Sequence, residues 1–365
     1  MVAAEGQSEN WKTEASKRKW CQHFSFPGFY FQLFMKVSII ITTCNRAEHL
    51  RQTLASLGQM HVPVELPTEL LVVDNASTDD TAEVVKSCRL PNFPVRYFHE
   101  PKRGQSNARN SGMANTAGEV ILFTDDDVRV PVDWVEKMAG PIFSDSVDAL
   151  GGAVTIAPHL RRPWMQEMHL SALASTERFY DKSSERVFLG ANMAFRRHVL
   201  ARVPGFDPEL GPGRLGFKDE SLFAEQLKIA GFSIAKRLEL PIEHHFEPSR
   251  LQRKSLLNTA RKRGASSAYV DHHWHYRAHP HAIKEFVIAG ARLFYYRARS
   301  LSDCLRQEGC AGREFSLVRK LWYWRQFMIE RRRSRNYAYH GLAKRSSVES
   351  ELDPKELITQ TRSIG

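Results

Sequence analysis

The chain has 365 residues, of which 42% are hydrophobic and 10% aromatic, so it can bury a sizeable core and is not intrinsically disordered. Its formal net charge is +11, and its five cysteines form neither a CxxC pair nor an even set, which excludes a disulfide scaffold and a thiolate metal site. No run reaches the roughly 18 to 20 apolar residues of a membrane-spanning helix. We therefore expect a cytoplasmic protein with reduced thiols.

Residues 1–34 differ in composition and hydrophobic pattern from the rest of the chain. A mixed polar segment runs into the aromatic cluster FSFPGFYFQLF, which Pro27 and Gly28 interrupt. Met35 stands directly before the first expected strand. We expect an N-terminal extension that is not native, with Met35 as the initiator. The alternative is an aromatic anchor that lies on a membrane surface.

From Lys36 onward, apolar runs alternate with amphipathic stretches. The apolar runs predict strands over 37–41, 70–73, 95–98 and 119–123, and the stretches between them predict helices over 47–57, 81–88 and 106–116. Uninterrupted apolar runs are typical of strands that are buried on both faces. The alternation predicts an α/β fold with a parallel sheet and right-handed crossovers.

Acidic residues follow two of these strands. Asp125, Asp126 and Asp127 come after the strand at 119–123, and Asp74 with Asn75 ends the strand at 70–73. Ligands of open α/β sheets bind beyond the carboxyl ends of the strands, so these side chains should meet in one crevice. Three adjacent acids repel one another unless a cation neutralises them. The pattern therefore predicts a divalent cation, Mg²⁺ or Mn²⁺, shared with a nucleotide-diphosphate substrate.

Four segments in order, between about residues 36 and 250, resemble the successive motifs of family 2 glycosyltransferases. They are VSIIITTCNR, LLVVDNASTDDT, GQSNARNSGMANTAGEVILFTDDDV and GFKDESLFAEQLKIAGF. The resemblance implies a GT-A type nucleotide-sugar-binding fold over 35–250 with a mostly parallel central sheet. It also implies an inverting, metal-dependent glycosyltransferase that moves a sugar from a nucleotide-diphosphate sugar to a hydroxyl of a saccharide or lipid-linked acceptor, in polysaccharide or glycolipid synthesis.

Two other classes of function are alternatives to a glycosyltransferase. A non-catalytic sensor or scaffold that binds a nucleotide sugar is the alternative, although such a protein would have lost its metal ligands or base. A nucleotidyltransferase of related fold would carry a Gly-rich signature near the first strand, and TTCNRAEHL has none.

By the resemblance, Thr42, Cys44, Asp74 and Asn75 hold the base and ribose of the nucleotide sugar. Cys44 stands where many members have a stacking aromatic, and Asn75 stands where many have an acid, so UDP, dTDP and GDP all stay open. The alternative for Asp74 is a turn or helix cap.

The resemblance also assigns residues around the diphosphate and the sugar. Arg109 would reach the diphosphate or support the base pocket; the alternative is an arginine on a helix surface. Gly190, Ala191 and Asn192, in VFLGANMAFRR, would line the donor sugar, where small residues let the backbone approach closely.

The metal site follows from the same resemblance. Asp127 would bind the metal directly, while Asp125 and Asp126 would orient the ribose and bound water. Of the pair His244 and His245, we expect His244 to complete the metal site. The alternative is a pair of surface histidines.

Asp219 and Glu220 fall on the two acidic positions of the family, of which the second is the catalytic base. We expect Glu220 rather than Asp219 to be that base. The alternative is that the acids only complement the N-terminal dipole of the helix they begin.

The basic surplus lies late in the chain. Residues 250–345 contain 22 lysines and arginines against 6 acids, interleaved with aromatics as in ARLFYYRAR and LVRKLWYWRQF. We expect 251–345 to be a basic, aromatic-rich helical region in peripheral contact with an anionic membrane, on the inner face. Solvated helical faces are the alternative, and no recognised module supports nucleic-acid binding. Residues 346–365 should form a flexible tail.

Overall fold

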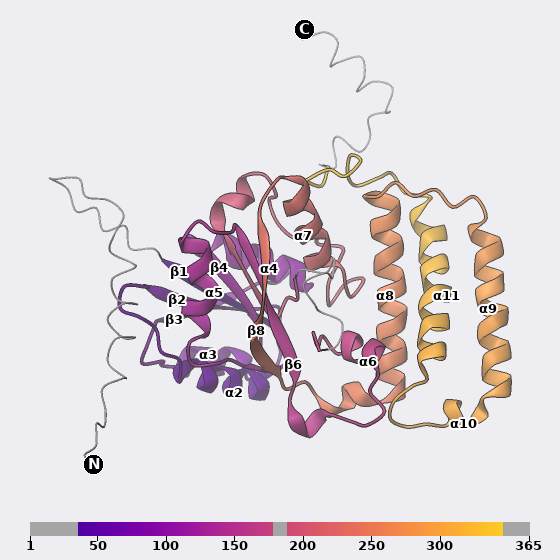
Figure 1. Cartoon of the computed structure of the whole chain (residues 1–365), viewed down its shortest axis with the longest axis horizontal. Coiled ribbons are helices and arrows are strands. Elements are labelled where there is room, and N and C mark those ends of the chain that lie inside the picture. Colours follow the sequence, from indigo (N-terminus) through magenta and orange to yellow (C-terminus); the bar gives the residue numbers. More distant parts are fainter. Residues whose placement is uncertain (1–35, 178–187, 346–365) are drawn as a thin grey trace, which may run out of the picture. The chain divides into compact units, whose positions relative to one another are not determined.

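The computed structural model describes residues 36–177 and 188–345 (Figure 1). The extension predicted at 1–34 and the tail predicted at 346–365 lie outside these residues. Within them, one eight-stranded sheet has the order β3-β2-β1-β4-β7-β6-β8-β5. The strands are β1 (Val37–Thr43), β2 (Thr68–Asp74), β3 (Val95–His99), β4 (Val120–Asp125), β5 (Val128–Arg129), β6 (Ala149–Ile156), β7 (Asn192–Arg196) and β8 (Ile234–His244).

The first four strands form the parallel part of the sheet that the sequence predicts. β1 pairs in parallel with both β2 and β4, and β2 pairs in parallel with β3. The remaining strands make the sheet mixed, because β7 is antiparallel to β4 and β6, and β5 is antiparallel to β8. The register places Thr43 opposite Asp74 and Thr42 opposite Asp125, so the ends of three strands lie side by side.

Helices cover both faces of the sheet. They are α2 (Ala47–Gly58), α3 (Thr81–Ser87), α4 (Gln105–Ala114), α5 (Trp134–Phe143), α6 (Glu167–Ala172) and α7 (Asp219–Ile229), with single turns at Pro158–Leu160, Arg197–Ala201 and Pro248–Leu251.

Alternate side chains of β1 supply the two cores. Ile39 and Ile41 pack with residues of α2, α3 and α5, whereas Ile40 packs on the other face with residues of α4 and α7. Because side chains alternate along a strand, an unbroken apolar run serves both layers at once.

The last third of the described chain is helical, as predicted. It contains α8 (Arg253–His273), α9 (Ala282–Arg299), α10 (Leu301–Cys304) and α11 (Gly312–Glu330). Leu256 and Leu257 of α8 join Phe315 and Val318 of α11 in one apolar cluster with residues 156–173, which attaches the helices to the sheet domain. None of the described helices is long and apolar enough to cross a membrane.

Candidate active site

The carboxyl ends of β1, β2 and β4 bring the predicted acids to one rim of the sheet. Asp126 and Asp127 are buried, while the side chain of Asp125 is 26% exposed. Burial raises the pKa of Asp125, and it raises the pKa of Asp126 to about 6. These carboxylates are therefore crowded enough to need cations beside them.

Arg46 supplies one of these cations. It lies in the turn after β1, and its Nη1 is 2.9 Å from Asp126 Oδ1 and 2.5 Å from Asp127 Oδ2. The hydroxyl of Thr43 donates to the second oxygen of Asp126 at 2.7 Å. Both oxygens of Asp126 are thus engaged within the protein.

His244 approaches the other oxygen of Asp127. Residue 244 pairs with Val128 in the β5–β8 ladder, which puts its imidazole beside the acid. Its Nε2 lies 3.2 Å from Asp127 Oδ1, and its Nδ1 donates to the Leu173 carbonyl at 3.0 Å. Burial by itself would raise the pKa of Asp127, but attraction to His244 and Arg46 holds that pKa well below its usual range. His245 instead contacts Glu243, so the structure brings His244 and not its neighbour to the acid.

The pair Asp127 and His244 fits a hard cation. Asp127 Oδ1 is buried and accepts no hydrogen bond. Because Nδ1 of His244 is the donor to a carbonyl, Nε2 is the ring nitrogen that faces that oxygen, and Arg250 Nη1 lies 3.4 Å from the same nitrogen. Two ligands of one octahedral Mg²⁺ lie about 3.0 Å apart, close to the observed separation. Either an imidazolium or a bound cation satisfies this contact.

The protein offers only part of a coordination sphere. Within residues 36–177 and 188–345, no group of three or more His, Cys, Asp or Glu side chains is placed to hold a metal. Mg²⁺ and Mn²⁺ sites that bind substrate phosphates take the remaining ligands from phosphate and water. Two protein ligands are compatible with such a shared site.

Arg109 connects the rim of the sheet to α7. Its Nη1 is 2.5 Å from Asp219 Oδ2, and both side chains are almost fully buried. Its Nη2 lies 3.9 Å from Asp125 Oδ1. A Cβ atom on Gly190 would lie 1.9 Å from the same nitrogen, so the glycine leaves room for the guanidinium. The alternative of a helix-surface arginine is therefore wrong.

The pair Asp219 and Glu220 begins α7. Asp219 is 1% exposed and committed to Arg109, whereas Glu220 is only half-buried. Burial raises the pKa of Glu220 to about 8, and repulsion from Asp219 adds to the rise. A carboxyl group with a raised pKa next to an open rim can exchange protons near neutral pH.

Around the expected base pocket, two polar residues are occupied by the protein itself. Asp74 accepts hydrogen bonds from the Ser77 amide at 2.9 Å and the Tyr97 hydroxyl at 2.8 Å. These contacts support the alternative role of a turn cap. Thr42 is buried and lies 3.3 Å from Gln105, while Cys44 is exposed at the rim.

Asn75 does not face a ligand as the sequence predicted. Its amide nitrogen donates to the carbonyls of Glu100 and Lys102, and its oxygen accepts from the Gly104 amide at 2.7 Å. The side chain is therefore used to fix the loop between β3 and α4.

The prediction that Asn192 lines the donor sugar is also corrected. Its side chain is fully buried, accepts from the indole of Trp134 at 2.9 Å and donates to the Ala153 carbonyl at 2.8 Å. It ties β7 to α5 and β6. Since its hydrogen bonds are made inside the core, its side chain does not line the site.

Sequence reasoning missed two arginines. Arg46 follows the motif TTCN, and Arg250 lies 3.4 Å from His244 Nε2. The signal that could have found Arg46 is its place: a cation directly after a strand whose neighbours end in acids. No comparable signal marks Arg250, because its position depends on how the chain after β8 turns back.

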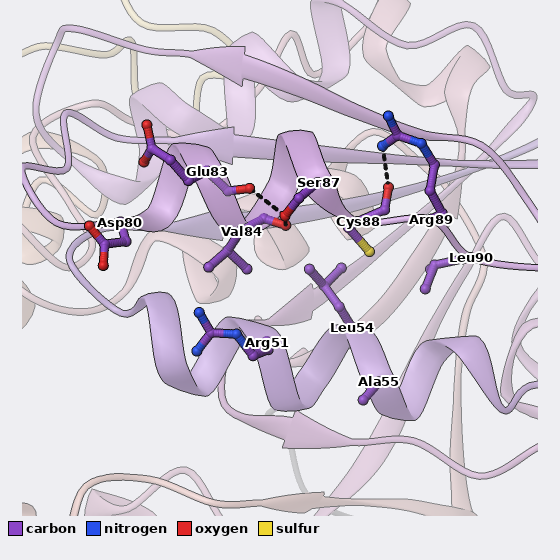
Figure 2. A pocket seen from close by; sticks show the side chains of 10 residues that line it. All are labelled: Arg51, Leu54, Ala55, Asp80, Glu83, Val84, Ser87, Cys88, Arg89 and Leu90. Carbon is purple, nitrogen blue, oxygen red and sulfur yellow. Dashed lines mark hydrogen bonds between the residues drawn. The ribbon is translucent and has the colours of Figure 1, made fainter.

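A separate hollow lies between α2 and α3, with a volume of about 630 Å³ (Figure 2). Two of its polar side chains bond to the local backbone: Ser87 donates to the Glu83 carbonyl at 2.6 Å and Arg89 to the Cys88 carbonyl at 2.7 Å. Its acids, Asp80 and Glu83, are not among the acids that the strand ends bring together.

Comparison with known proteins bears on this arrangement. The profile of the family described as "Glycosyl transferase family 2" matches residues 38–203. Glycosyltransferase AglE of Haloferax volcanii is 32% identical over 120 residues, which are 32% of this chain and 39% of that protein. The succinoglycan biosynthesis protein ExoM of Rhizobium meliloti is 28% identical over 63% of this chain and 72% of its own length. Among solved structures, a mannosyltransferase from Pyrobaculum calidifontis, in complex with GDP-Man and Mn²⁺, has a TM-score of 0.48 and 19% identity, covering 79% of this chain and 69% of its own.

Proposed function

The chain carries a domain of glycosyl transferase family 2, and from this premise we propose that it transfers a sugar from a nucleotide-diphosphate sugar to a hydroxyl of a saccharide or lipid-linked acceptor, in polysaccharide or glycolipid synthesis. Family membership, the α/β sheet and the helices after it confirm the predicted fold class, a GT-A type domain followed by a helical region. The boundaries 35–250 and 251–345 stay predictions.

One observation carries the proposal: Arg109 ties the acid at the start of α7 to the acid at the end of β4. Asp219 contacts the guanidinium at 2.5 Å and Asp125 lies 3.9 Å from it. Glu220, next to Asp219, is thereby held near the rim where the donor diphosphate would lie. An inverting transferase needs this juxtaposition, because base and leaving group must act on opposite sides of one anomeric carbon.

Glu220 is the base in this proposal, and the reaction is a single displacement with inversion. Its carboxylate takes the proton of the acceptor hydroxyl as that oxygen attacks the anomeric carbon, and the bond to the nucleoside diphosphate breaks. Arg109 is close enough to the rim to stabilise the departing diphosphate. Asp219 keeps Arg109 in place.

Asp127 and His244 would hold the divalent cation, Mg²⁺ or Mn²⁺. When bound, the cation neutralises the charge that develops on the leaving diphosphate. The buried Oδ1 of Asp127, which accepts no hydrogen bond, supports this assignment. Thr42, Cys44 and Asp125 stay the proposed contacts to the nucleotide, with Gly190 on the sugar side.

We also propose a cellular location for the enzyme. We place it in the cytoplasm, with the basic helical region in peripheral contact with the inner membrane face. Among the described cysteines, Cys44, Cys88, Cys304 and Cys310 are all free thiols, which suits a reducing compartment.

A specific observation also favours the alternative of a nucleotide-sugar sensor. Arg46 forms ion pairs with both Asp126 and Asp127. A protein that only binds the donor could keep this closed arrangement. The two functions differ in turnover, so the experiment must separate binding from transfer.

The test measures hydrolysis and transfer with a panel of nucleotide sugars, with and without Mn²⁺ or Mg²⁺. Wild type should release nucleoside diphosphate from one donor only when the metal is present. Glu220→Gln should lose about 10²-fold or more, the range for removing a general base, and Asp127→Ala, which removes the proposed metal ligand, should lose the metal-dependent activity. Asp80→Ala and Glu83→Gln, which change acids of the separate hollow, should keep full activity.

The presence of a product and its anomeric configuration distinguish the inverting transferase from the alternatives. Inversion at the anomeric carbon, followed by NMR, supports the single displacement; retention would exclude it. Tight donor binding without turnover in wild type, unchanged in Glu220→Gln, would replace the transferase by the sensor.

A further inference from the structure

One side of α9 exposes an apolar strip, which we call the α9 face. Phe294 is 76% exposed and Leu305 81% exposed. Of the eleven large hydrophobic side chains that are exposed in residues 36–177 and 188–345, four lie on α9, namely Ile283, Val287, Phe294 and Tyr295, and two follow it, Leu301 in α10 and Leu305 just after. Spacings of four and seven residues place Ile283, Val287 and Phe294 on one side of α9, and Tyr295 borders that side. Exposed strips of this kind mark interaction surfaces.

The opposite side of α9 is already packed. Ala289, Leu293 and Tyr296 are buried, and Leu293 joins the cluster that contains Phe315 and Val318 of α11. Figure 1 shows α9 at the outer edge, with α11 between it and α8. The strip is therefore the unpartnered side of the outermost helix.

Cations flank the α9 face. Lys284 and Arg292 are exposed and have no hydrogen-bond or ion-pair partner within the described residues, and Arg299 lies 5.7 Å from the ring centre of Tyr295. Such a combination of apolar strip and flanking cations is typical of helices that lie in a lipid headgroup region.

The acids of this stretch are both engaged. Glu285 lies 3.4 Å from Lys320 of α11, and Asp303 accepts from the Tyr296 hydroxyl at 2.6 Å and contacts Arg306 at 3.0 Å. No unpaired carboxylate between residues 282 and 306 would therefore meet a negative surface.

We propose that the α9 face docks on a lipid membrane that carries anionic headgroups. The apolar side chains would enter the headgroup boundary, and Lys284, Arg292 and Arg299 would meet the lipid charges. A second copy of the chain is the less suitable occupant, because pairing two α9 faces would bring these same cations together. The inference rests on the proposed function only in placing the acceptor at a membrane; docking itself requires neither donor nor catalysis.

Co-sedimentation of the full chain with vesicles tests the proposal. Phosphatidylcholine vesicles that contain phosphatidylserine should bind the protein, and pure phosphatidylcholine vesicles should not. Lys284→Gln with Arg292→Gln should weaken binding roughly thirtyfold, since each cation near an anionic surface contributes about fivefold. Val287→Ser with Phe294→Ser should weaken it at least about tenfold.

Matched controls change exposed residues elsewhere. Val64→Ser with Val132→Ser removes two exposed apolar side chains of the sheet domain, and Lys86→Gln with Arg89→Gln removes two cations. Both should bind vesicles like wild type. Circular dichroism checks that every variant keeps its helical content.

Three results would overturn the proposal. The first is no sedimentation with phosphatidylserine vesicles, and the second is an equal loss in test and control variants. The third is a dimer by light scattering that Val287→Ser with Phe294→Ser converts to a monomer while vesicles are ignored, which would make a second copy the occupant. Donor turnover, measured in solution, is independent: a protein that turns over its donor but ignores vesicles refutes only the docking.

Discussion

The pH dependence of transfer should report Glu220. Because its pKa is raised to about 8, only about one tenth of the side chains are deprotonated at pH 7. A base must be deprotonated to accept the acceptor proton, so kcat/KM should rise about tenfold between pH 7 and a plateau above pH 9. Nucleoside diphosphate release with Mg²⁺, which tolerates alkaline buffers better than Mn²⁺, measures this rise.

Two variants test whether ionisation of Glu220 causes this rise in kcat/KM. In Asp219→Asn the repulsion from the neighbouring acid is gone and Arg109 is no longer neutralised, so the pKa of Glu220 should fall and the rise should move to lower pH. In Glu220→Gln the rise should disappear with the activity. A flat profile from pH 6.5 to 9.5, or a rise that Asp219→Asn leaves in place, would refute Glu220 as the base.

The same pKa also makes stability depend on pH. A carboxyl whose pKa is higher in the folded than in the unfolded chain stabilises the fold at low pH, and this contribution is lost as the pH rises through about 8. Denaturant unfolding of wild type should therefore show falling stability between pH 5 and 8. Glu220→Gln, which cannot ionise, should show a smaller fall over the same range.

Three further substitutions test the contacts around the site. Arg109→Met leaves Asp219 buried without its cation and should lower the free energy of unfolding by about 3 to 5 kcal/mol, measured by denaturant titration; a loss below about 1 kcal/mol would mean that the pair is not buried as described. Gly190→Ala would place a methyl group where the Arg109 guanidinium lies, so transfer should fall at least about tenfold while circular dichroism stays unchanged. Asp207→Ala removes a fully buried carboxylate that contacts Lys344 at 3.0 Å, and should cost about 3 kcal/mol of unfolding free energy without changing donor affinity in calorimetry.

The parallel half of the sheet could be predicted from the sequence because its signal is local. Strands buried on both faces read as continuous apolar runs, and the expected strand at 37–41 is found as Val37–Thr43. The strand expected at 70–73 is longer, Thr68–Asp74, because the polar start of β2 is buried too. Ser38 donates to Glu69 at 2.8 Å inside the sheet, and such a satisfied polar pair does not show in a hydrophobic pattern.

The rest of the sheet could not be predicted in the same way. β5 has only two residues, and its pairing of Val128 with His244 joins segments that are more than a hundred residues apart. That pairing is what puts the imidazole beside Asp127. Periodicity indicates that a strand exists but not which distant strand it will join, so the histidine could be proposed only through the family resemblance.

The buried polar residues explain the corrections at Asn75 and Asn192. Both belong to motifs that resemble donor-binding segments, yet the side-chain amide of each is hydrogen-bonded to backbone or indole groups of this chain. A sequence pattern gives the residue type at the rim but not the direction of its side chain. Buried amides must be satisfied, and the nearest partners here are inside the protein.

Arg109 shows most clearly why the site is a property of the whole fold. The guanidinium contacts Asp219 at the start of α7, lies within 4 Å of Asp125 at the end of β4, and lies 5.4 Å from the ring centre of Phe206. Gly190 can carry no side chain beside it. These residues come from four separate stretches of sequence, and one buried cation requires all of them, since an unpaired guanidinium in the core would be costly. The segment SNARNSG is compatible with both a helix surface and a buried site, and only the convergence of these stretches decides between them.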